Sequence, residues 1–266
     1  MLVADTRVLR SPNIARCRAM LVVALFLTWE VAARLHWLDP DFFSPPSAVA
    51  EALVRMLTNT QITAAAGITV LEVLYAYTFA AIVGVLGGLT VGLSPFAYRV
   101  FQPIILLLFA VPKMVMLPLF ILFFGIGVFS KSVFAFTLGV FPIILNVIAG
   151  TRMVDPTLVT AAYSMGANQT AIFLKVVVPA ALPSVITGLR LGMTQTVLGV
   201  LLAELYGASS GLGYYIALYT QSFKPAEVFA LFFAIAALSI ITNEFLRFLE
   251  HRAGQWREEE AEGVIV

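Results

Sequence analysis

Residues 160–183 read TAAYSMGANQTAIFLKVVVPAALP, a stretch of small and polar residues that contains one glycine and two prolines. Long apolar runs flank it, at 132–150 and at 184–206. A hydrocarbon core about 30 Å thick requires roughly 20 apolar residues in a helix. The quoted stretch is too polar and too interrupted for this, so we predict a loop between two membrane-spanning helices.

The composition of the whole chain supports a membrane protein. Of its 266 residues, 61% are hydrophobic and 12% are charged, whereas soluble domains are about half apolar and about 25% charged. The net charge of +1 gives no argument for nucleic-acid binding. Cys17 is the single cysteine, and the two histidines, His36 and His251, lie near opposite ends of the chain. We therefore predict no disulfide within the chain and no metal site.

Six stretches are long and apolar enough to cross a bilayer. They lie near 19–36, 67–93, 100–124, 132–150, 184–206 and 228–249. The arginines before the first stretch resemble the start of a cleavable signal peptide. Because five further spans follow, an uncleaved signal anchor is favoured. The predicted organisation is an N-terminal tail (1–18), a membrane domain (19–249, with its main loop at 151–183) and a C-terminal tail (250–266).

The distribution of basic residues orients the spans, since short cytoplasmic loops are enriched in lysine and arginine. With the N-terminus in the cytoplasm, eleven basic residues fall on the cytoplasmic side: Arg7, Arg10, Arg16, Arg18, Arg99, Arg152, Lys175, Arg190, Arg247, Arg252 and Arg257. Four fall outside, namely Arg34, Arg55, Lys131 and Lys224. Both termini and the quoted loop are therefore predicted to be cytoplasmic.

Two short helices are predicted in this loop. Asp155-Pro156 is typical of a helix start, with a capping acid followed by proline at the first helical position. Gly166 suits the stop, where a left-handed backbone is common. Between them runs a short apolar stripe, made of Leu158, Ala161, Ala162 and Met165. Asn168 is predicted to cap a second helix through Val177, ended by Pro179 and Pro183. On these grounds alone, a solvated amphipathic loop remains the alternative to a docking element.

The same loop resembles that of the permeases of binding-protein-dependent ABC importers. Their pattern is Glu-Ala-Ala, three residues, Gly, nine residues, and Ile-x-Leu-Pro. Ala161-Ala162, Gly166 and Pro179 fall at this spacing, with Val176 and Val178 in place of the isoleucine and leucine. Thr160 replaces the usual glutamate, which leaves a carboxylate contact at this position in doubt.

Further segments resemble the nitrate/sulfonate/taurine branch of this family, over roughly residues 43–256. They are the stretches 43–49, 111–120, 124–127 and 179–183, together with Ala203-Glu204, Gly211-Leu-Gly-Tyr214 and Trp256. One departure is Glu72, since the branch usually carries an arginine there. This reversed charge could concern the contact with a binding protein or with the substrate.

The resemblance implies an all-α integral membrane protein with six transmembrane helices and a cytoplasmic coupling helix between spans four and five, the type I ABC importer permease fold. It implies a second permease subunit, two ATPase subunits and an external substrate-binding protein as partners, in a prokaryotic cytoplasmic membrane. ATP and magnesium would be held by the ATPase, and no cofactor by this chain. The implied coupling residues are Leu158, Thr160, Ala161, Ala162, Met165, Gly166, Ala167 and Pro179.

Two helix faces carry glycine at every fourth residue. They are formed by Gly84, Gly88 and Gly92 in the second span, and by Gly188 and Gly192 in the fifth. Such faces allow helix backbones to approach closely in lipid. Packing within the bundle is the favoured interpretation, and a homodimer seam is the alternative.

Three ionisable residues are candidates for the translocation path, because charges inside a membrane usually face a wet cavity or the bundle interior. Lys113 is predicted mid-span, about 20 Å along a straight helix from Phe101. Glu204 lies at the outer end of the fifth span and Glu72 near the outer start of the second. For Lys113 the alternative is an internal salt bridge with Glu72 or Glu204, and for Glu204 it is a structural role.

The chain is not predicted to be an enzyme, since it has no Gly-Lys-Ser/Thr element for phosphate binding. The alternative function is a self-contained secondary transporter or channel. Such a protein would show inverted repeats, and none is evident. The solute is not readable from the sequence; the branch handles nitrate, sulfonates, taurine and thiamine-precursor-like molecules, and Lys113 mildly favours a small anion or zwitterion.

Overall fold

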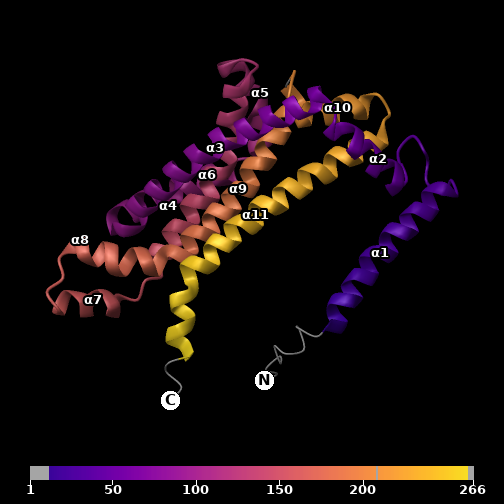
Figure 1. Cartoon of the computed structure of the whole chain (residues 1–266). Coiled ribbons are helices and arrows are strands. Elements are labelled where there is room, and N and C mark those ends of the chain that lie inside the picture. Colours follow the sequence, from indigo (N-terminus) through magenta and orange to yellow (C-terminus); the bar gives the residue numbers. More distant parts are fainter. Residues whose placement is uncertain (1–11, 208, 263–266) are drawn as a thin grey trace. The chain divides into compact units, whose positions relative to one another are not determined.

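A computed structural model describes residues 12–207 and 209–262, and its regular secondary structure is helical (Figure 1). The elements are α1 (Pro12–Arg34), α2 (Pro46–Leu57), α3 (Thr60–Leu93), α4 (Pro95–Ala110), α5 (Lys113–Phe124), α6 (Val128–Arg152), α7 (Pro156–Ser164), α8 (Gln169–Ile172), the π-helical turn η2 (Phe173–Val177), α9 (Val178–Gly207), α10 (Leu212–Gln221) and α11 (Pro225–Glu262). Parts of the predicted tails, 1–11 and 263–266, lie outside the described residues. The all-α fold class is confirmed.

The chain divides into two compact units. The smaller unit contains the chain up to Thr63 and residues 215–234, and the larger unit contains residues 64–214 and the chain from Ile235 onward. The chain therefore passes between the units at 63/64, within α3, at 214/215, within α10, and at 234/235, within α11.

Helix α6 forms the centre of the larger unit. Its Phe134, Ile143 and Val147 are fully buried. Ile143 and Val147 pack with Ala80 of α3 and, through partly buried side chains, with α9. Figure 1 shows α6 and α9 running alongside each other over most of their lengths. The buried apolar surface of α6 thus holds α3 and α9 together.

The predicted glycine faces lie against α6. A Cβ atom at Gly84 would come within 2.6 Å of Ile143, and one at Gly88 within 2.6 Å of Val147. Gly92 faces Thr151, while Gly188 and Gly192 face Asn146 and Ile143. These separations are too short for a side chain, so the backbones of α3 and α9 approach α6 as closely as glycine allows.

Helix α6 also contributes glycines to this packing, which the sequence reasoning did not identify. A Cβ atom at Gly150 would lie 2.6 Å from Ser184 of α9, and Gly139 leaves no room for a side chain beside Thr196. Because both helices supply small residues, the α6–α9 contact is close at several levels of the bundle.

The predicted span at 100–124 is not one straight helix. Helix α4 ends at Ala110, α5 begins at Lys113, and the two are bent by 90°. Val111 is extended (φ −63°, ψ 129°), because the ring of a following proline, here Pro112, disfavours the helical conformation of the residue before it. The prediction that Lys113 lies on one straight helix with Phe101 is therefore wrong, and its depth in the membrane stays a prediction.

Three helical segments of the described chain have the length and hydropathy of a membrane span: α3, α6 and the continuous helix Gln169–Tyr206. The bent pair α4–α5 gives a fourth if it is counted as one span. These four correspond to the predicted spans at 67–93, 132–150, 184–206 and 100–124. The six-span count remains a prediction.

The smaller unit contains an aromatic cluster and a helix N-terminus that is held by hydrogen bonds. The Trp29 ring in α1 contacts Phe229 of α11, with centroids 5.3 Å apart. Glu30 of α1 accepts hydrogen bonds from the backbone N–H (3.0 Å) and the hydroxyl (2.8 Å) of Ser47. Ser47 lies in the first turn of α2, where N–H groups lack helical partners, so Glu30 fixes the start of α2.

Candidate functional site

Helix α7 begins as its sequence predicts. The side chain of Asp155 accepts a hydrogen bond from the backbone N–H of Thr157 at 2.8 Å, and Pro156 occupies the first helical position. The N–H of Thr157 stabilises the ionised carboxyl and lowers the pKa of Asp155 below its ordinary value. The start of the loop helix is thus set by a negatively charged cap.

Helix α7 ends in a left-handed glycine. Gly166 has φ +83°, and its N–H bonds to the carbonyl of Tyr163 at 3.0 Å. The N–H of Ala167 bonds to the carbonyl of Ala162 at 3.1 Å. These two bonds define a Schellman motif. In this motif the residue after the glycine, here Ala167, also makes a hydrophobic contact with the last turn of the helix, here Ala162. The predicted stop is confirmed, and the spacing of Ala162, Gly166 and Ala167 has a physical cause.

The second helix of the loop starts as predicted but does not stop. Asn168 caps α8 by accepting the N–H of Ala171 at 2.8 Å. The helix then continues through η2 into α9, so the predicted end at Pro179 and Pro183 is wrong. A proline in a helix collides with the carbonyl four residues earlier. The wider π turn before Pro179 relieves this collision, because π hydrogen bonds run over five residues.

The loop has a small apolar core of its own. Ala162, Ile172 and Val177 are buried together, with Val159, Ala167 and other partly buried side chains packed around them. Ala162 therefore faces inward and belongs to this core. The four residues of the predicted apolar stripe therefore do not share one face. Ala162 is buried, whereas Leu158, Ala161 and Met165 are exposed.

The outer surface of the loop is apolar. Leu158 is 53% exposed, Tyr163 62%, Met165 80% and Met153 81%. Figure 1 shows α7 and α8 together beyond one end of the α6–α9 pair. An exposed apolar surface on a polar loop is typical of a site for a partner protein.

Thr160 lies on this outer surface. Its hydroxyl donates to the carbonyl of Pro156 at 2.9 Å. It borders a hollow of about 340 Å³ that is also lined by Val159, Tyr163 and Ser164. Pro179, the remaining predicted coupling residue, is half-buried at the start of α9.

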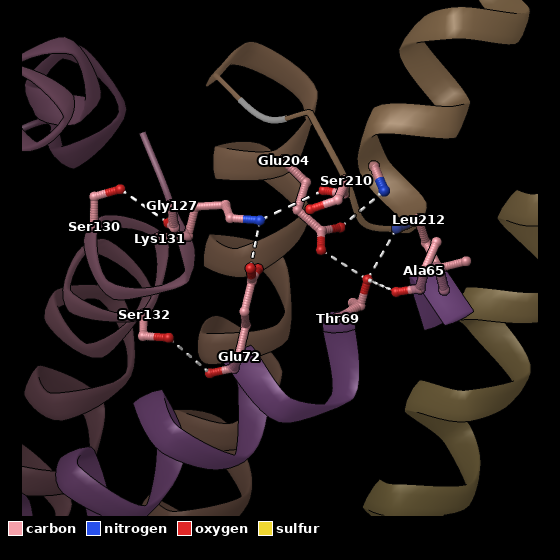
Figure 2. Close-up of polar contacts among 11 residues, drawn as sticks. Ala65, Thr69, Glu72, Gly127, Ser130, Lys131, Ser132, Glu204, Ser210 and Leu212 are labelled. Carbon is pink, nitrogen blue, oxygen red and sulfur yellow. Dashed lines mark hydrogen bonds and ion pairs between the residues drawn. The ribbon is translucent and has the colours of Figure 1, made fainter. Parts of the chain in front are cut away.

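A buried polar cluster occupies the other end of α6 and α9, where α6 begins and α9 ends (Figure 2). Glu204 of α9 is 1% exposed. Its carboxylate accepts from the hydroxyl of Thr69 at 2.7 Å and from the backbone N–H of Gly213 at 2.8 Å. The N–H of Leu212 donates to the Thr69 hydroxyl at 2.9 Å. Glu204 and Thr69 thus cap the N-terminus of α10, where negative charge is favoured.

Lys131 and Glu72 form the second part of the cluster. They make an ion pair in which both side chains are at most 5% exposed. The Lys131 ammonium also lies 3.4 Å from the carbonyl of Ser210, and the Ser132 hydroxyl donates to the carbonyl of Glu72 at 3.4 Å. Figure 2 shows the Glu72 and Lys131 side chains directed toward each other. Glu72, the departure from the branch pattern, thus has a cation partner within its own chain.

The glycines before α10 fit tightly around Glu204. Gly211 has φ +108°, and its position leaves no room for a Cβ atom beside the Glu204 carboxyl. A Cβ atom at Gly213 would lie 2.6 Å from the Glu204 Cβ. The sequence Gly211-Leu-Gly213 is therefore required by the close approach of this segment to α9.

Lys113 does not join this cluster. Its ammonium donates to the carbonyl of Phe109 at 2.9 Å and lies 4.6 Å from the centre of the Phe141 ring. Phe109 is in the last turn of α4, whose carbonyls lack helical partners and attract a cation. Of the three predicted path residues, Glu72 and Glu204 are brought together, and Lys113 caps the broken helix. Neither predicted salt bridge of Lys113 is seen among the described residues.

Sequence reasoning missed the role of Lys131, which it had assigned only to an outer loop. The one available signal was the position of a lysine at the start of an apolar run. Its acidic partner lies on another helix, and no local spacing connects the two.

Comparison with known proteins decides the family. Residues 76–255 match the profile described as "Binding-protein-dependent transport system inner membrane component". The chain belongs to this family. It is a type I ABC importer permease of the nitrate/sulfonate/taurine branch, and its predicted family membership is confirmed.

Three relatives show how widely the similarity extends along the permease. This chain is 30% identical to the taurine transport system permease protein of Escherichia coli K12, and the match covers 90% of this chain and 88% of that protein. It is 28% identical to a putative aliphatic sulfonates transport permease of Bacillus subtilis 168, over 90% and 86% of the two chains. A formylaminopyrimidine transport permease of Halalkalibacterium halodurans is 27% identical, over 89% and 94%.

Solved structures support the fold of the permease. Inward facing forms of the MetNI methionine ABC transporter match with a TM-score of 0.53 and 22% identity. This match covers 69% of the permease and 91% of that chain. At this identity the likeness shows the fold alone. The permease is a membrane transport protein.

Proposed function

We propose that this permease forms half of the translocation path of an ATP-driven importer. A second permease subunit, favoured as an identical copy, completes the path, and two ATPase subunits that bind ATP and magnesium drive it. An external binding protein delivers the solute. Both termini and the α7–α8 loop face the cytoplasm, which the excess of basic residues on that side supports.

The observation that carries this proposal is the outer surface of α7. Leu158, Tyr163 and Met165 are exposed on a helix whose two ends are fixed, by Asp155 and by the left-handed Gly166. A rigid short helix with exposed apolar side chains suits docking into a groove of another protein. The ATPase supplies that groove, and its closure on ATP moves α7 and, through the continuous helix from α8 to α9, the membrane domain.

The solute is a small anion or zwitterion. The relatives at 27–30% identity are permeases for taurine, aliphatic sulfonates and formylaminopyrimidine, and the first two of these solute classes carry a sulfonate anion. Lys113 lies half-buried at the break between α4 and α5. Its ammonium donates to the carbonyl of Phe109 at the end of α4, and we assign it the contact with the anionic group of the solute.

The test is co-purification of the ATPase with variants of the outer surface of α7. Leu158→Asp places a charge in the contact without altering the core of the loop. We expect at least about a tenfold loss of ATPase binding, which corresponds to about 1.4 kcal/mol. Thr170→Asp is the matched control, because Thr170 is exposed on α8 and its replacement adds the same charge away from α7.

Two results would contradict the proposal. One is normal ATPase recovery with Leu158→Asp together with a second surface variant, Met165→Asp. The other is solute uptake by the permease alone, which would favour a self-contained transporter or channel.

A further inference from the structure

We propose that the buried polar cluster of Thr69, Glu72, Lys131, Glu204 and the backbone of residues 210–213 is a latch. It is closed in this structure and must open once in each transport cycle. This inference rests on the proposed function, since ATP-driven movement at the α7 end supplies the force that opens it.

The position of the cluster in the bundle is the first argument. Helix α6 begins at the cluster and ends at α7, and α9 begins at the loop and ends at the cluster. The cluster and the docking loop therefore occupy opposite ends of the same two closely packed helices. Alternating access requires that the bundle close at one end while it opens at the other. Contacts in the cluster can close its end of the α6–α9 pair while the α7–α8 end moves.

The second argument is the position of the cluster in the chain. All its members belong to the larger unit, but two of the three chain crossings between the units lie within a few residues of it. Thr69 follows the crossing at 63/64, and Leu212 and Gly213 precede the crossing at 214/215. Both crossings lie near the first turn of a helix, α3 or α10, and element-terminal residues of this kind can act as hinges. The cluster is placed to fix or release two such segments together.

The third argument is the precision of the closed arrangement. The first two N–H groups of α10 are both bound, by the Thr69 hydroxyl at 2.9 Å and by the Glu204 carboxylate at 2.8 Å. Gly211 and Gly213 allow no Cβ atom beside Glu204. The start of α10 therefore has one well-defined position against α9 and α3. Movement of α10 away from them breaks the hydrogen bonds to Thr69 and to Glu204 at the same time.

The fourth argument is that the cluster is incompletely satisfied. It contains two carboxyl groups and one ammonium group, all nearly inaccessible. Among the described residues, the second carboxyl oxygen of Glu72 has no hydrogen-bond donor. Buried polar networks that lack partners are costly in a low-dielectric interior. Opening lets water reach Glu72, which lowers the free-energy difference between the closed and open states and makes the latch reversible.

The test is a disulfide across the latch. Thr69→Cys and Leu212→Cys, in a Cys17→Ala background, place one thiol on α3 and one on α10. The backbone N of Leu212 lies 2.9 Å from the Thr69 hydroxyl oxygen, so the two Cα atoms lie within the roughly 7 Å that a disulfide can bridge. In the purified permease we expect the disulfide to form nearly completely under mild oxidation. Failure to form it would contradict the closed arrangement itself.

The decisive reading is the rate of disulfide formation in the complex with the ATPase. We expect magnesium-ATP with vanadate to slow the reaction by about tenfold, because an open latch separates the two thiols. In vesicles, the oxidised variant should lose uptake and a reductant should restore it. Equal rates with and without nucleotide, or full uptake by completely crosslinked permease, would show a static tie and overturn the latch.

These outcomes separate the latch from the proposed function. If the ATPase binds and hydrolyses ATP normally while the disulfide rates stay equal, the latch alone is overturned. If the ATPase does not bind the unsubstituted permease, the proposed function is overturned, and the driving force of the latch with it.

Discussion

The two ends of the α6–α9 pair differ in what they bury and what they expose. At the α7–α8 end, Leu158 and Met165 are exposed, and only a small apolar core stabilises the loop. At the other end, Glu72, Lys131 and Glu204 are buried against each other. The loop thus exposes an apolar surface that another protein can cover, whereas the contacts of the cluster are made by residues of this chain.

The difference also concerns how each end is specified. The ends of the loop helices are fixed by hydrogen bonds between residues two to five positions apart, such as Asp155 with Thr157 and Ala162 with Ala167. The cluster joins Thr69 to residues more than 130 positions away. Substitutions at the loop should therefore act mainly on partner binding, and substitutions at the cluster on stability. The following predictions test this contrast.

The largest effect is expected for Lys131→Met. It leaves two buried carboxyl groups without a cation, and removal of one partner of a buried pair costs about 3–5 kcal/mol. We expect a large fall in the melting temperature in detergent. Lys224→Met, at an exposed lysine, serves as control. The double variant Glu72→Gln/Lys131→Met should recover part of the loss, and no recovery would count against a charge effect.

Next in size is Gly211→Ala, compared with Gly166→Ala at the other end. Both glycines have positive φ, which costs an alanine about 1–3 kcal/mol. At Gly166 a Cβ atom meets open space, whereas at Gly211 it meets Glu204. We expect Gly211→Ala to lower the melting temperature clearly more. Equal effects would show that backbone strain alone matters at both positions.

A third comparison separates the inner and outer faces of α7. Ala162→Glu buries a carboxylate in the core of the loop, and we expect it to destabilise the loop and to abolish ATPase binding. Leu158→Asp should abolish binding while limited proteolysis of the loop remains unchanged. If both variants leave the loop equally resistant to protease, Ala162 is not buried in the core of the loop.

The smallest effect is expected for Thr160→Glu. It restores the usual residue of the family at an exposed position beside a hollow, and it removes one hydrogen bond to Pro156. Exposed substitutions of this kind usually change stability by less than about 0.5 kcal/mol. Uptake in vesicles should stay within about twofold of the unsubstituted permease. A complete loss would show that the ATPase groove is adapted to threonine.

Much of the loop could be predicted from the sequence because its determinants are local. The caps at Asp155 and Asn168 and the stop at Gly166 each depend on a few neighbouring residues. The prediction failed at Pro179, because nothing local indicated that a π turn would let the helix continue.

The cluster and the helix break were less accessible to such reasoning. The pairing of Glu72 with Lys131 depends on how α3 packs on α6, which no spacing along the chain reveals. Pro112 did signal the break between α4 and α5, but the apolar run from 100 to 124 was interpreted as one span. In lipid a bent pair and a straight helix can have the same hydropathy, so composition does not distinguish them.

Solute uptake into vesicles, with and without the ATPase, tests the central claim most directly. With the purified permease, its ATPase and loaded binding protein, we predict uptake that requires ATP and is lost in Leu158→Asp. Vesicles that contain the permease alone should accumulate nothing. Uptake by the permease alone, or ATP-driven uptake that Leu158→Asp and Met165→Asp leave unchanged, would contradict the account.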